Sequence, residues 1–406
     1  MLVKDIKSRE KISFFAKCLC VYFALMLCNI FSIAGLGTIL KLYAVFLLVI
    51  SVRYLPQARV RFDTTFVSQI GYLLICFFSL LYSINLDQSL STVITLAMNF
   101  GLVIICQSIR FSPLEVKMLQ RSLYLGGILV LISSLFFADF STANRLTIQI
   151  MGDAADQNFI NGYLLFAFSY FVYQAINGRK LKVLNIAIVF LFLLFTFATG
   201  SRGSLLALLS VVAILLLIKV LNRKKDILKV LIFVIILLMA FSVILSILPE
   251  DVAIRFSQDY IEENGTTSRS EIWTALLTRF FNDDLFSLLF GKGVETAVYY
   301  NNYDDHVAHN VFIEVLIGTG FVGLTFYCLI IFSIFKKAWL SKNYIEFAAF
   351  FGYMIMCMSL SLTSYKPIFN AIMIIEISYR SFVRSNTNIS EIKTEDHLTL
   401  QNNVYE

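Results

Sequence analysis

The hydrophobic pattern of the chain consists of long apolar runs separated by polar connections. Most runs have about the length of twenty residues that a helix needs to cross a bilayer. The pattern therefore predicts an all-α polytopic membrane protein with about twelve transmembrane helices. The runs lie near residues 13–33, 36–52, 65–84, 89–108, 122–140, 158–176, 183–200, 204–221, 228–248, 310–335, 344–363 and 367–383.

Composition agrees with a membrane protein and argues against other classes. The 406 residues are 58% hydrophobic and only 15% charged, which a soluble protein of this size would not tolerate. The formal charge of +6 does not indicate a nucleic-acid partner, because the basic residues gather in short connections between apolar runs. All seven cysteines lie in apolar segments, so neither a disulfide framework nor a zinc site is supported.

Basic residues predict the orientation of the spans. Lysine and arginine are enriched in cytoplasmic connections, and with a cytoplasmic N-terminus every alternate connection carries them. The outer connections 34–37 and 85–89 carry none. The alternation also predicts a cytoplasmic C-terminus. The inner connections contain Arg53, Arg59, Arg61, Arg110, Lys117, Arg121, Arg179, Lys180, Lys182, Arg223, Lys224, Lys225, Lys336, Lys337 and Lys342.

A few basic residues on the predicted outer side contradict this bias. For Arg279 and Lys292 we expect pairing with acidic residues of the same loop. Arg202 lies in the short connection 199–204, where two glycines allow a tight turn that holds the arginine at the outer surface. The two serines there and the free N–H groups opening the next helix are suited to an anion. The simpler alternative is an interfacial arginine that snorkels. The full set is Arg145, Arg202, Arg255, Arg269, Arg279, Lys292 and Lys366.

One large acidic loop, from about Pro249 to Ala308, is predicted to be external. Its first part, Pro249–Glu263, is predicted to form a short helix. Ser268–Glu271 fits a capping box, and apolar doublets four residues apart then predict an amphipathic helix that lies flat on the membrane or packs over the bundle. This helix carries Arg269 at its N-terminal end, where the helix dipole favours an anion. Leu289–Gly293 is predicted to be a turn, and its lone Gly-x-Gly pattern is no evidence of nucleotide binding.

Two histidines, His306 and His309, precede the apolar run that follows this loop. Histidine is suited to proton transfer near neutral pH. Arginine binds phosphate oxygens through two parallel hydrogen bonds and stays charged. Several arginines with a histidine on one side of the membrane therefore predict chemistry on a diphosphate-linked substrate. The simpler alternative for His309 is an interfacial residue at the start of a helix, and we expect His306 to be structural.

Four short motifs occur in a characteristic order. They are Thr199–Gly203, Arg269–Trp273, Phe290–Gly293 and His309–Asn310, the last followed by Gly320 and Gly323. Together they resemble the O-antigen polymerase and O-antigen ligase superfamily of bacterial envelopes. The upstream residues Arg145, Gly152 and Asp156–Asn158 also fit its pattern, so that the resemblance covers about residues 145–335.

The resemblance implies a glycosyltransferase with a GT-C-like architecture. Such enzymes use an undecaprenyl-diphosphate-linked glycan at the outer face of the bacterial plasma membrane. The resemblance implies that His309 is catalytic and that Arg202, Arg269 and Arg145 hold the diphosphate. Many members have an acidic residue where this chain has Gly318, and Glu314 lies one turn earlier. Further supporting residues would be Asn310, Glu314, Arg255, His306 and Trp273.

Members of the superfamily are mainly polymerases or ligases. We expect a polymerase that joins undecaprenyl-diphosphate-linked repeat units into a capsule, O-antigen or exopolysaccharide, because nothing marks a dedicated acceptor. The alternative is a ligase that transfers finished glycan to another acceptor. We expect no cofactor and no metal. The expected partners are the lipid-linked oligosaccharide, the bilayer, a flippase and a chain-length regulator, with no nucleic acid.

Two other function classes remain open. A lipid-linked glycan transporter would place charges deep in the spans, for which Glu376 and Lys41 are the candidates. A metal-dependent enzyme would use Asp304, Asp305 and the histidines as ligands.

The chain is expected to divide into four regions. These are N-terminal transmembrane helices (1–144), a catalytic region (145–335) that includes the outer loop 249–308, C-terminal transmembrane helices (336–384) and a disordered cytoplasmic tail (385–406).

Overall fold

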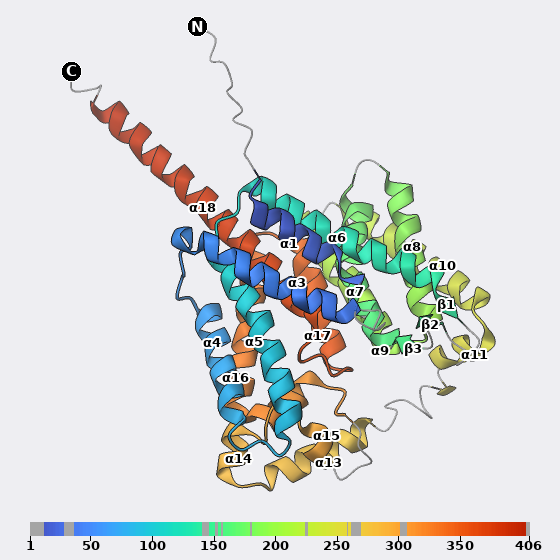
Figure 1. The fold of residues 1–406 in the computed structure, drawn as a ribbon. Helices are drawn as coiled ribbons and strands as arrows, with labels where there is room; N and C mark the ends of the chain where they lie inside the picture. The colour runs from blue at the N-terminus through green and yellow to red at the C-terminus, as the bar shows by residue number, and fades with distance from the viewer. Residues whose placement is uncertain are drawn as a thin grey trace.

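The protein is a bundle of helices (Figure 1). Within the residues that the structure describes, every apolar run of the sequence includes a helix. The computed structural model describes residues 12–27, 36–139, 146–150, 153–155, 157–178, 181–223, 226–257, 259–260, 269–300 and 307–402. The helices in the apolar runs are α1 (Phe14–Ala24), α3 (Leu36–Ser51), α4 (Thr64–Ser79), α5 (Leu86–Ser108), α6 (Pro113–Phe136), α7 (Gln157–Asn177), α8 (Lys182–Ala198), α9 (Arg202–Asn222), α10 (Ile227–Ile247), α16 (Val311–Leu340), α17 (Tyr344–Cys357) and α18 (Lys366–Asn402).

Shorter elements lie in the connections. A small antiparallel sheet in the order β1-β2-β3 precedes α7. The helices α13, α14 and α15 lie together at one end of the bundle, whereas the final turns of α18 project away from it (Figure 1). The bounds are η1 (Val52–Gln57), β1 (Ala138–Asp139), β2 (Thr147–Ile150), β3 (Asp153–Ala155), α11 (Glu250–Ala253), η3 (Ile254–Phe256), α13 (Arg269–Phe281), α14 (Leu285–Phe290) and α15 (Ala297–Tyr300).

The structure is helical and its helices are apolar, which confirms the prediction of an all-α membrane protein. Within the described residues, seven helices are long and apolar enough to cross a membrane. Four more, α1, α4, α8 and α17, are apolar but have only 10–17 residues. The number of twelve spans and the external position of the large loop therefore stay predictions.

Polar residues in the connections begin the helices. The side chains of Asp63 and Asn85 accept hydrogen bonds from backbone N–H groups that open α4 and α5. Ser112 and Glu115 form a capping box at α6, with Pro113 as its first residue. Glu115 also accepts a 2.8 Å hydrogen bond from the backbone of Ser13, which ties the start of α1 to α6.

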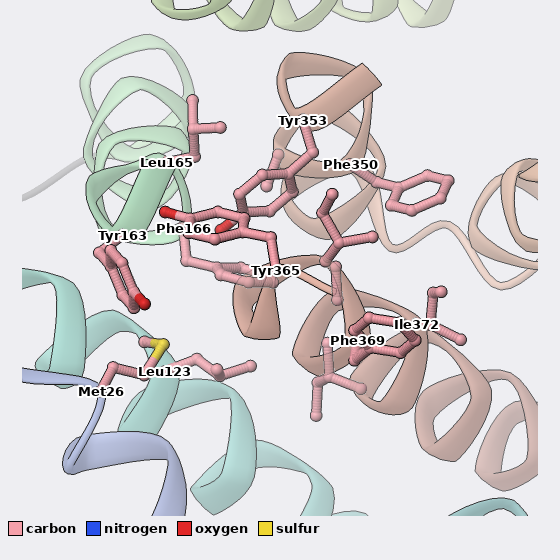
Figure 2. Packing of buried hydrophobic residues seen from close by; sticks show 14 of the residues in the cluster. Met26, Leu123, Tyr163, Leu165, Phe166, Phe350, Tyr353, Tyr365, Phe369 and Ile372 are labelled. Carbon is pink, nitrogen blue, oxygen red and sulfur yellow. The ribbon is translucent and has the colours of Figure 1, made fainter. Parts of the chain in front are cut away.

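Aromatic side chains fill the interior between α7, α17 and α18 (Figure 2). Phe166 and Tyr353 are fully buried, and their ring centroids are 5.7 Å apart. The Tyr365 hydroxyl donates a 2.6 Å hydrogen bond to the carbonyl oxygen of Phe159, so that the polar tip of this buried ring has a partner. This packing fixes the connection between α17 and α18 against α7.

The long helix α16 is interrupted at Gly320, where φ is 64° and ψ is −169°. Glycine adopts this backbone conformation far more readily than any other residue. Just before the break, the carbonyl oxygens of Ile317 and Gly318 accept hydrogen bonds from the backbone of Lys292 at 2.8 Å and Gly293 at 3.0 Å. The turn after α14 thus satisfies carbonyl groups at the end of a helical segment.

The glycines on both sides of this contact allow the two backbones to approach. A Cβ atom on Gly320 would lie 2.3 Å from the backbone of Leu289, and one on Gly291 would lie 2.4 Å from that of Gly318. Tyr82, between α4 and α5, donates a 2.7 Å hydrogen bond to the carbonyl oxygen that precedes Gly291. The predicted turn at 291–293 therefore joins α14 to the break in α16.

Buried ion pairs join α4, α16 and α18 at the other end of α16. The Lys337 Nζ lies 2.8 Å from Asp63 Oδ2 and 2.5 Å from Glu376 Oε1. Glu376, a candidate charge for a transporter, is thus fully buried in an ion-pair cluster. The other candidate, Lys41, is exposed on α3.

Two further expectations differ from the structure. Within the predicted helix Pro249–Glu263, the described residues form only the short elements α11 and η3 before Ser257. The tail expected to be disordered continues α18 as far as Asn402. Neither glycine nor proline occurs between Ile368 and Asn402, so nothing in that stretch breaks the helix. The boundaries of the four regions stay predictions.

Candidate functional site

His309 lies directly before α16 in a backbone conformation that is uncommon for its type. Its φ of +49° is in the left-handed region. The next residue, Asn310, is buried, and its side chain accepts hydrogen bonds from the N–H groups of Phe312 at 3.0 Å and Ile313 at 3.3 Å. Asn310 is therefore the N-cap of α16. The half-buried His309 is presented by a capped helix start rather than by a free loop.

The backbone of Ala308, the residue before His309, is held through both its carbonyl oxygen and its N–H group. The Trp273 Nε1 donates a 2.6 Å hydrogen bond to the carbonyl oxygen of Ala308. The backbone of Ala308 also hydrogen-bonds to the carboxylate of Glu314, one turn into α16. Ala308 itself is fully buried. Two supporting residues expected from the motifs, Trp273 and Glu314, thus fix the backbone that carries His309.

Glu314 links this helix start to the connection between α17 and α18. Its side chain is buried, and it accepts hydrogen bonds from the hydroxyl groups of Ser361 at 2.5 Å and Thr363 at 3.4 Å. A buried carboxylate needs such donors, because burial without partners is costly. The superfamily position of the acid is Gly318 here, where a Cβ would lie 3.0 Å from the carbonyl oxygen of Gly293. The structure therefore has little room for an acidic side chain at Gly318.

Arg202 begins α9 at the same end of the bundle. A Cβ on Gly203 would lie 2.5 Å from the Ser359 hydroxyl oxygen, so the start of α9 touches the same connection whose Ser361 binds Glu314. Ser201 caps α9 by accepting a hydrogen bond from the Ser204 N–H. The Arg202 guanidinium lies 5.8 Å from the ring centroid of Tyr260. The turn 199–204 and the start of α16 thus face one shared connection.

Arg255 adds a second guanidinium at the α8–α9 turn. Its Cδ would be 3.3 Å from a Cβ on Gly200, whose φ is +65°. The neighbouring Phe256 packs on Phe197 of α8, with ring centroids 5.0 Å apart. The buried Nε of Arg255 has no hydrogen-bond partner among the described residues. The η3 segment therefore places Arg255 over the glycine of the turn that carries Arg202.

The α8–α9 turn is supported from behind by buried polar contacts. The Asn161 side chain of α7 donates a 3.0 Å hydrogen bond to Thr199 and accepts one from Thr196. The backbone N–H of Leu146 donates to the carbonyl oxygen of Ala198 at 2.8 Å. The residue directly before β2 is thus attached to this turn. Two predicted site residues, Arg145 and His306, lie outside the described residues.

Arg269 is the first described residue of α13, as expected for the N-terminal end of the amphipathic helix. The apolar stripe of that helix, Ile272, Leu276 and Phe280, is buried against Leu316 and Ile317 of α16. The helix therefore packs over the bundle, which was one of the two predicted placements. The predicted capping residue Ser268 lies outside the described residues.

Arg279 and Lys292 are engaged within the large loop. The Lys292 Nζ lies 3.2 Å from Asp283 Oδ1 and 3.8 Å from Asp284 Oδ2, which confirms the predicted acid pairing. The guanidinium of Arg279 stacks 4.4 Å from the Tyr300 ring centroid and donates to the Tyr300 carbonyl oxygen. The Tyr300 hydroxyl donates to Asp283, and burial together with this carboxylate raises the pKa of Tyr300.

Glu295 is a half-buried carboxylate that the motifs did not indicate. It follows the turn 291–293, has a φ of +58°, and accepts a hydrogen bond from Thr92 of α5. Burial raises the pKa of Glu295, although the hydrogen bond from Thr92 opposes the shift. Glu295 also interacts electrostatically with Glu314. Its burial depends on contacts across the chain, so no local sequence signal marks it.

The described residues hold no group of three or more His, Cys, Asp or Glu side chains suited to a metal ion. Asp304, Asp305 and His306, which the metal hypothesis requires, lie outside this part of the chain. The hypothesis of a metal-dependent enzyme therefore stays untested.

The comparison with protein families agrees with the motifs. Residues 187–328 match the family model described as O-Antigen ligase. The resemblance to the superfamily is therefore confirmed, and the matched region contains Arg202, Arg269 and His309.

Other comparisons add no functional argument. No curated protein matches the chain. A solved structure titled "Structural coordination of polymerization and crosslinking by a peptidoglycan synthase complex" is similar with 14% identity and a TM-score of 0.47, over 78% of this chain and 97% of that chain. A likeness of this degree does not bear on the reaction.

Proposed function

We propose that this O-antigen ligase-domain protein is a membrane glycosyltransferase that polymerises undecaprenyl-diphosphate-linked repeat units into a surface polysaccharide. The family match supports a membrane enzyme that processes glycans. One observation carries the proposal: the connection between α17 and α18 contacts the starts of both α9 and α16. Ser359 of this connection lies against Gly203, which follows Arg202, and Ser361 donates a hydrogen bond to Glu314, one turn into the helix that follows His309. A base and a phosphate-binding group therefore stand at the same end of the bundle.

In the proposed reaction, His309 accepts the proton of an acceptor sugar hydroxyl. The hydroxyl oxygen forms a bond to the anomeric carbon of the donor, and the bond from that carbon to the diphosphate oxygen breaks. Undecaprenyl diphosphate leaves with the bonding electrons. The protonated imidazole then releases its proton to solvent. No metal or cofactor is required for this balance.

The arginines stabilise the leaving diphosphate. Arg202 at the start of α9, Arg255 over Gly200 and Arg269 at the start of α13 present guanidinium groups, which remain charged and bind phosphate oxygens in pairs. Arg202 and Arg269 also occupy helix N-termini, where backbone N–H groups favour anions. Arg145 is proposed as a further diphosphate contact on the resemblance alone.

Glu314 and Trp273 are positioning residues in this proposal. Glu314 accepts a hydrogen bond from the backbone of Ala308, and Trp273 donates one to the Ala308 carbonyl oxygen. Asn310 caps the turn that follows. His309 keeps its left-handed backbone because both neighbours are fixed. Such preorganisation lowers the cost of bringing the base to the acceptor hydroxyl.

We place the reaction at the outer face of the bacterial plasma membrane, with both termini in the cytoplasm. The distribution of basic residues supports this orientation. A flippase that delivers the lipid-linked unit and a chain-length regulator are the proposed partners.

A ligase is the second candidate, because the matching family model is described as O-Antigen ligase. A deletion strain separates the two functions through the glycans it accumulates. Single repeat units on the lipid carrier or at the surface support the polymerase. Long chains retained on undecaprenyl diphosphate contradict the polymerase and support the ligase. Unchanged glycans exclude both.

A further inference from the structure

Five arginines gather at the end of the bundle where α18 passes two connections. Arg59 and Arg61 lie between η1 and α4, Arg110 lies between α5 and α6, and Arg380 and Arg384 belong to α18. Arg384 interacts electrostatically with Arg110, Arg380 and Arg59, and Arg380 interacts with Arg61. Neighbouring guanidinium groups repel one another, so this cluster of arginines favours a bound anion.

The acidic residues in this region do not balance the arginines. Asp63 and Glu376 face the cluster, and both are paired with Lys337, at 2.8 Å and 2.5 Å. With Lys337 counted, six basic side chains meet two carboxylates among the described residues. The region therefore keeps an excess of positive charge.

Arg380 shows where the anion would bind. It is only 8% exposed, although a buried guanidinium requires hydrogen-bond acceptors. Its Nη1 donates a 3.4 Å hydrogen bond to the carbonyl oxygen of Arg59, and its Nε lies 3.8 Å from Glu376 Oε2. Neither Nε nor Nη2 has a hydrogen-bond partner among the described residues. A phosphate oxygen is the acceptor that suits a guanidinium best.

Apolar residues beside the cluster indicate a lipid rather than a soluble anion. Val60 and Phe62 alternate with Arg59 and Arg61, and they are 48% and 80% exposed. Exposed apolar side chains next to basic residues at the end of a membrane bundle are suited to the boundary between the headgroups and the acyl chains. Basic clusters at cytoplasmic helix ends recognise anionic lipids in the same way.

We propose that Arg59, Arg61, Arg110, Arg380 and Arg384 bind the phosphate headgroup of an anionic phospholipid. The site lies at the opposite end of α16 from His309, in the leaflet that the basic connections assign to the cytoplasm. Val60 and Phe62 contact the acyl region beside the bound headgroup. This site is independent of the glycosyl transfer proposed above.

The test uses the full chain in phosphatidylcholine nanodiscs titrated with phosphatidylglycerol, with native mass spectrometry to count retained phosphatidylglycerol. The double variant Arg59→Gln/Arg61→Gln changes two exposed side chains. Each arginine near a membrane contributes about a fivefold change in affinity, so we expect roughly twenty-fivefold weaker retention for the loss of two. The control Arg223→Gln removes an exposed arginine at the end of α9 and should retain the lipid as the unchanged protein does.

Two further measurements decide the class of ligand. Inorganic phosphate at millimolar concentration should not displace phosphatidylglycerol, and Phe62→Ser should weaken its retention while all five arginines remain. Equal retention by the double variant, or an equal loss in Arg223→Gln, overturns the site. Displacement by inorganic phosphate with no effect of Phe62→Ser overturns the assignment to a lipid.

Discussion

The indole Nε1 of Trp273 donates a 2.6 Å hydrogen bond to the carbonyl oxygen of Ala308. This contact joins α13, from the large loop, to the residue that precedes His309. Since α13 also packs its apolar stripe on α16, the loop helix and the histidine form one unit. The large loop thus helps to position the proposed base.

Replacing Trp273 by phenylalanine tests this positioning. Trp273→Phe keeps an aromatic ring but removes the donor, which is worth about 1 kcal/mol. We expect turnover of lipid-linked glycan to fall about fivefold, with little change in thermal stability. Trp339→Phe, at the exposed second tryptophan, is the matched control and should be neutral. Equal turnover in both variants would remove Trp273 from the account.

Replacing Arg202 by lysine tests the diphosphate contact. Arg202→Lys keeps the positive charge at the start of α9 but loses the planar fork that binds two phosphate oxygens. We expect a loss of tenfold or more in transfer rate, since a hydrogen bond to a charged group is worth about 1.5–3 kcal/mol. The assay compares it with Arg223→Lys, at the far end of the same helix. Wild-type transfer by Arg202→Lys would leave Arg202 with only a topological role.

Replacing Gly320 by alanine tests the junction between α14 and α16. Gly320→Ala places a Cβ 2.3 Å from the Leu289 backbone at a φ of +64°. We expect destabilisation by about 3 kcal/mol or more, seen as a lower melting temperature in detergent. Gly101→Ala is the control, because a Cβ there would meet only Leu48 at 3.8 Å. If both variants melt alike, the break in α16 does not depend on glycine.

Glu295 predicts a specific dependence of stability on pH. Burial raises its pKa in the folded protein, so the folded state favours the protonated side chain. The stability from this group is fully present below its unfolded pKa and is lost as pH rises through the folded pKa. Glu295→Gln stays neutral and still accepts from Thr92, so the variant should gain melting temperature relative to the unchanged protein as pH rises. A gain that is constant with pH would show that Glu295 does not titrate in this way.

Much of the fold follows from local sequence. Apolar runs predict the helices because, in a membrane, each run must satisfy its backbone N–H and C=O groups with hydrogen bonds inside the segment. The tight turn that holds Arg202 after Gly200 also follows from the sequence, because such turns depend on neighbouring residues. The cap that Asn310 forms at the start of α16 was not predicted. The family motifs indicate His309 without any knowledge of its contacts.

Other features depend on contacts between distant residues. The break at Gly320 forms with the turn 291–293, and Glu295 accepts a hydrogen bond from Thr92, about two hundred residues earlier in the chain. Neither contact leaves a periodic signal. The polar composition of residues 385–406 favours disorder, yet α18 continues to Asn402, and neither glycine nor proline occurs between Ile368 and Asn402.

The most direct test of the central claim is the turnover of lipid-linked repeat units by purified His309→Asn. Asparagine tolerates the left-handed backbone found here, so the helix start should be kept while the base is removed. His309→Ala serves as a second variant, and unchanged melting temperature is required of at least one of them. The account predicts a loss of about 10²–10⁴-fold, the usual contribution of general base catalysis. Turnover equal to that of the unchanged protein, in a variant that remains folded, would contradict it.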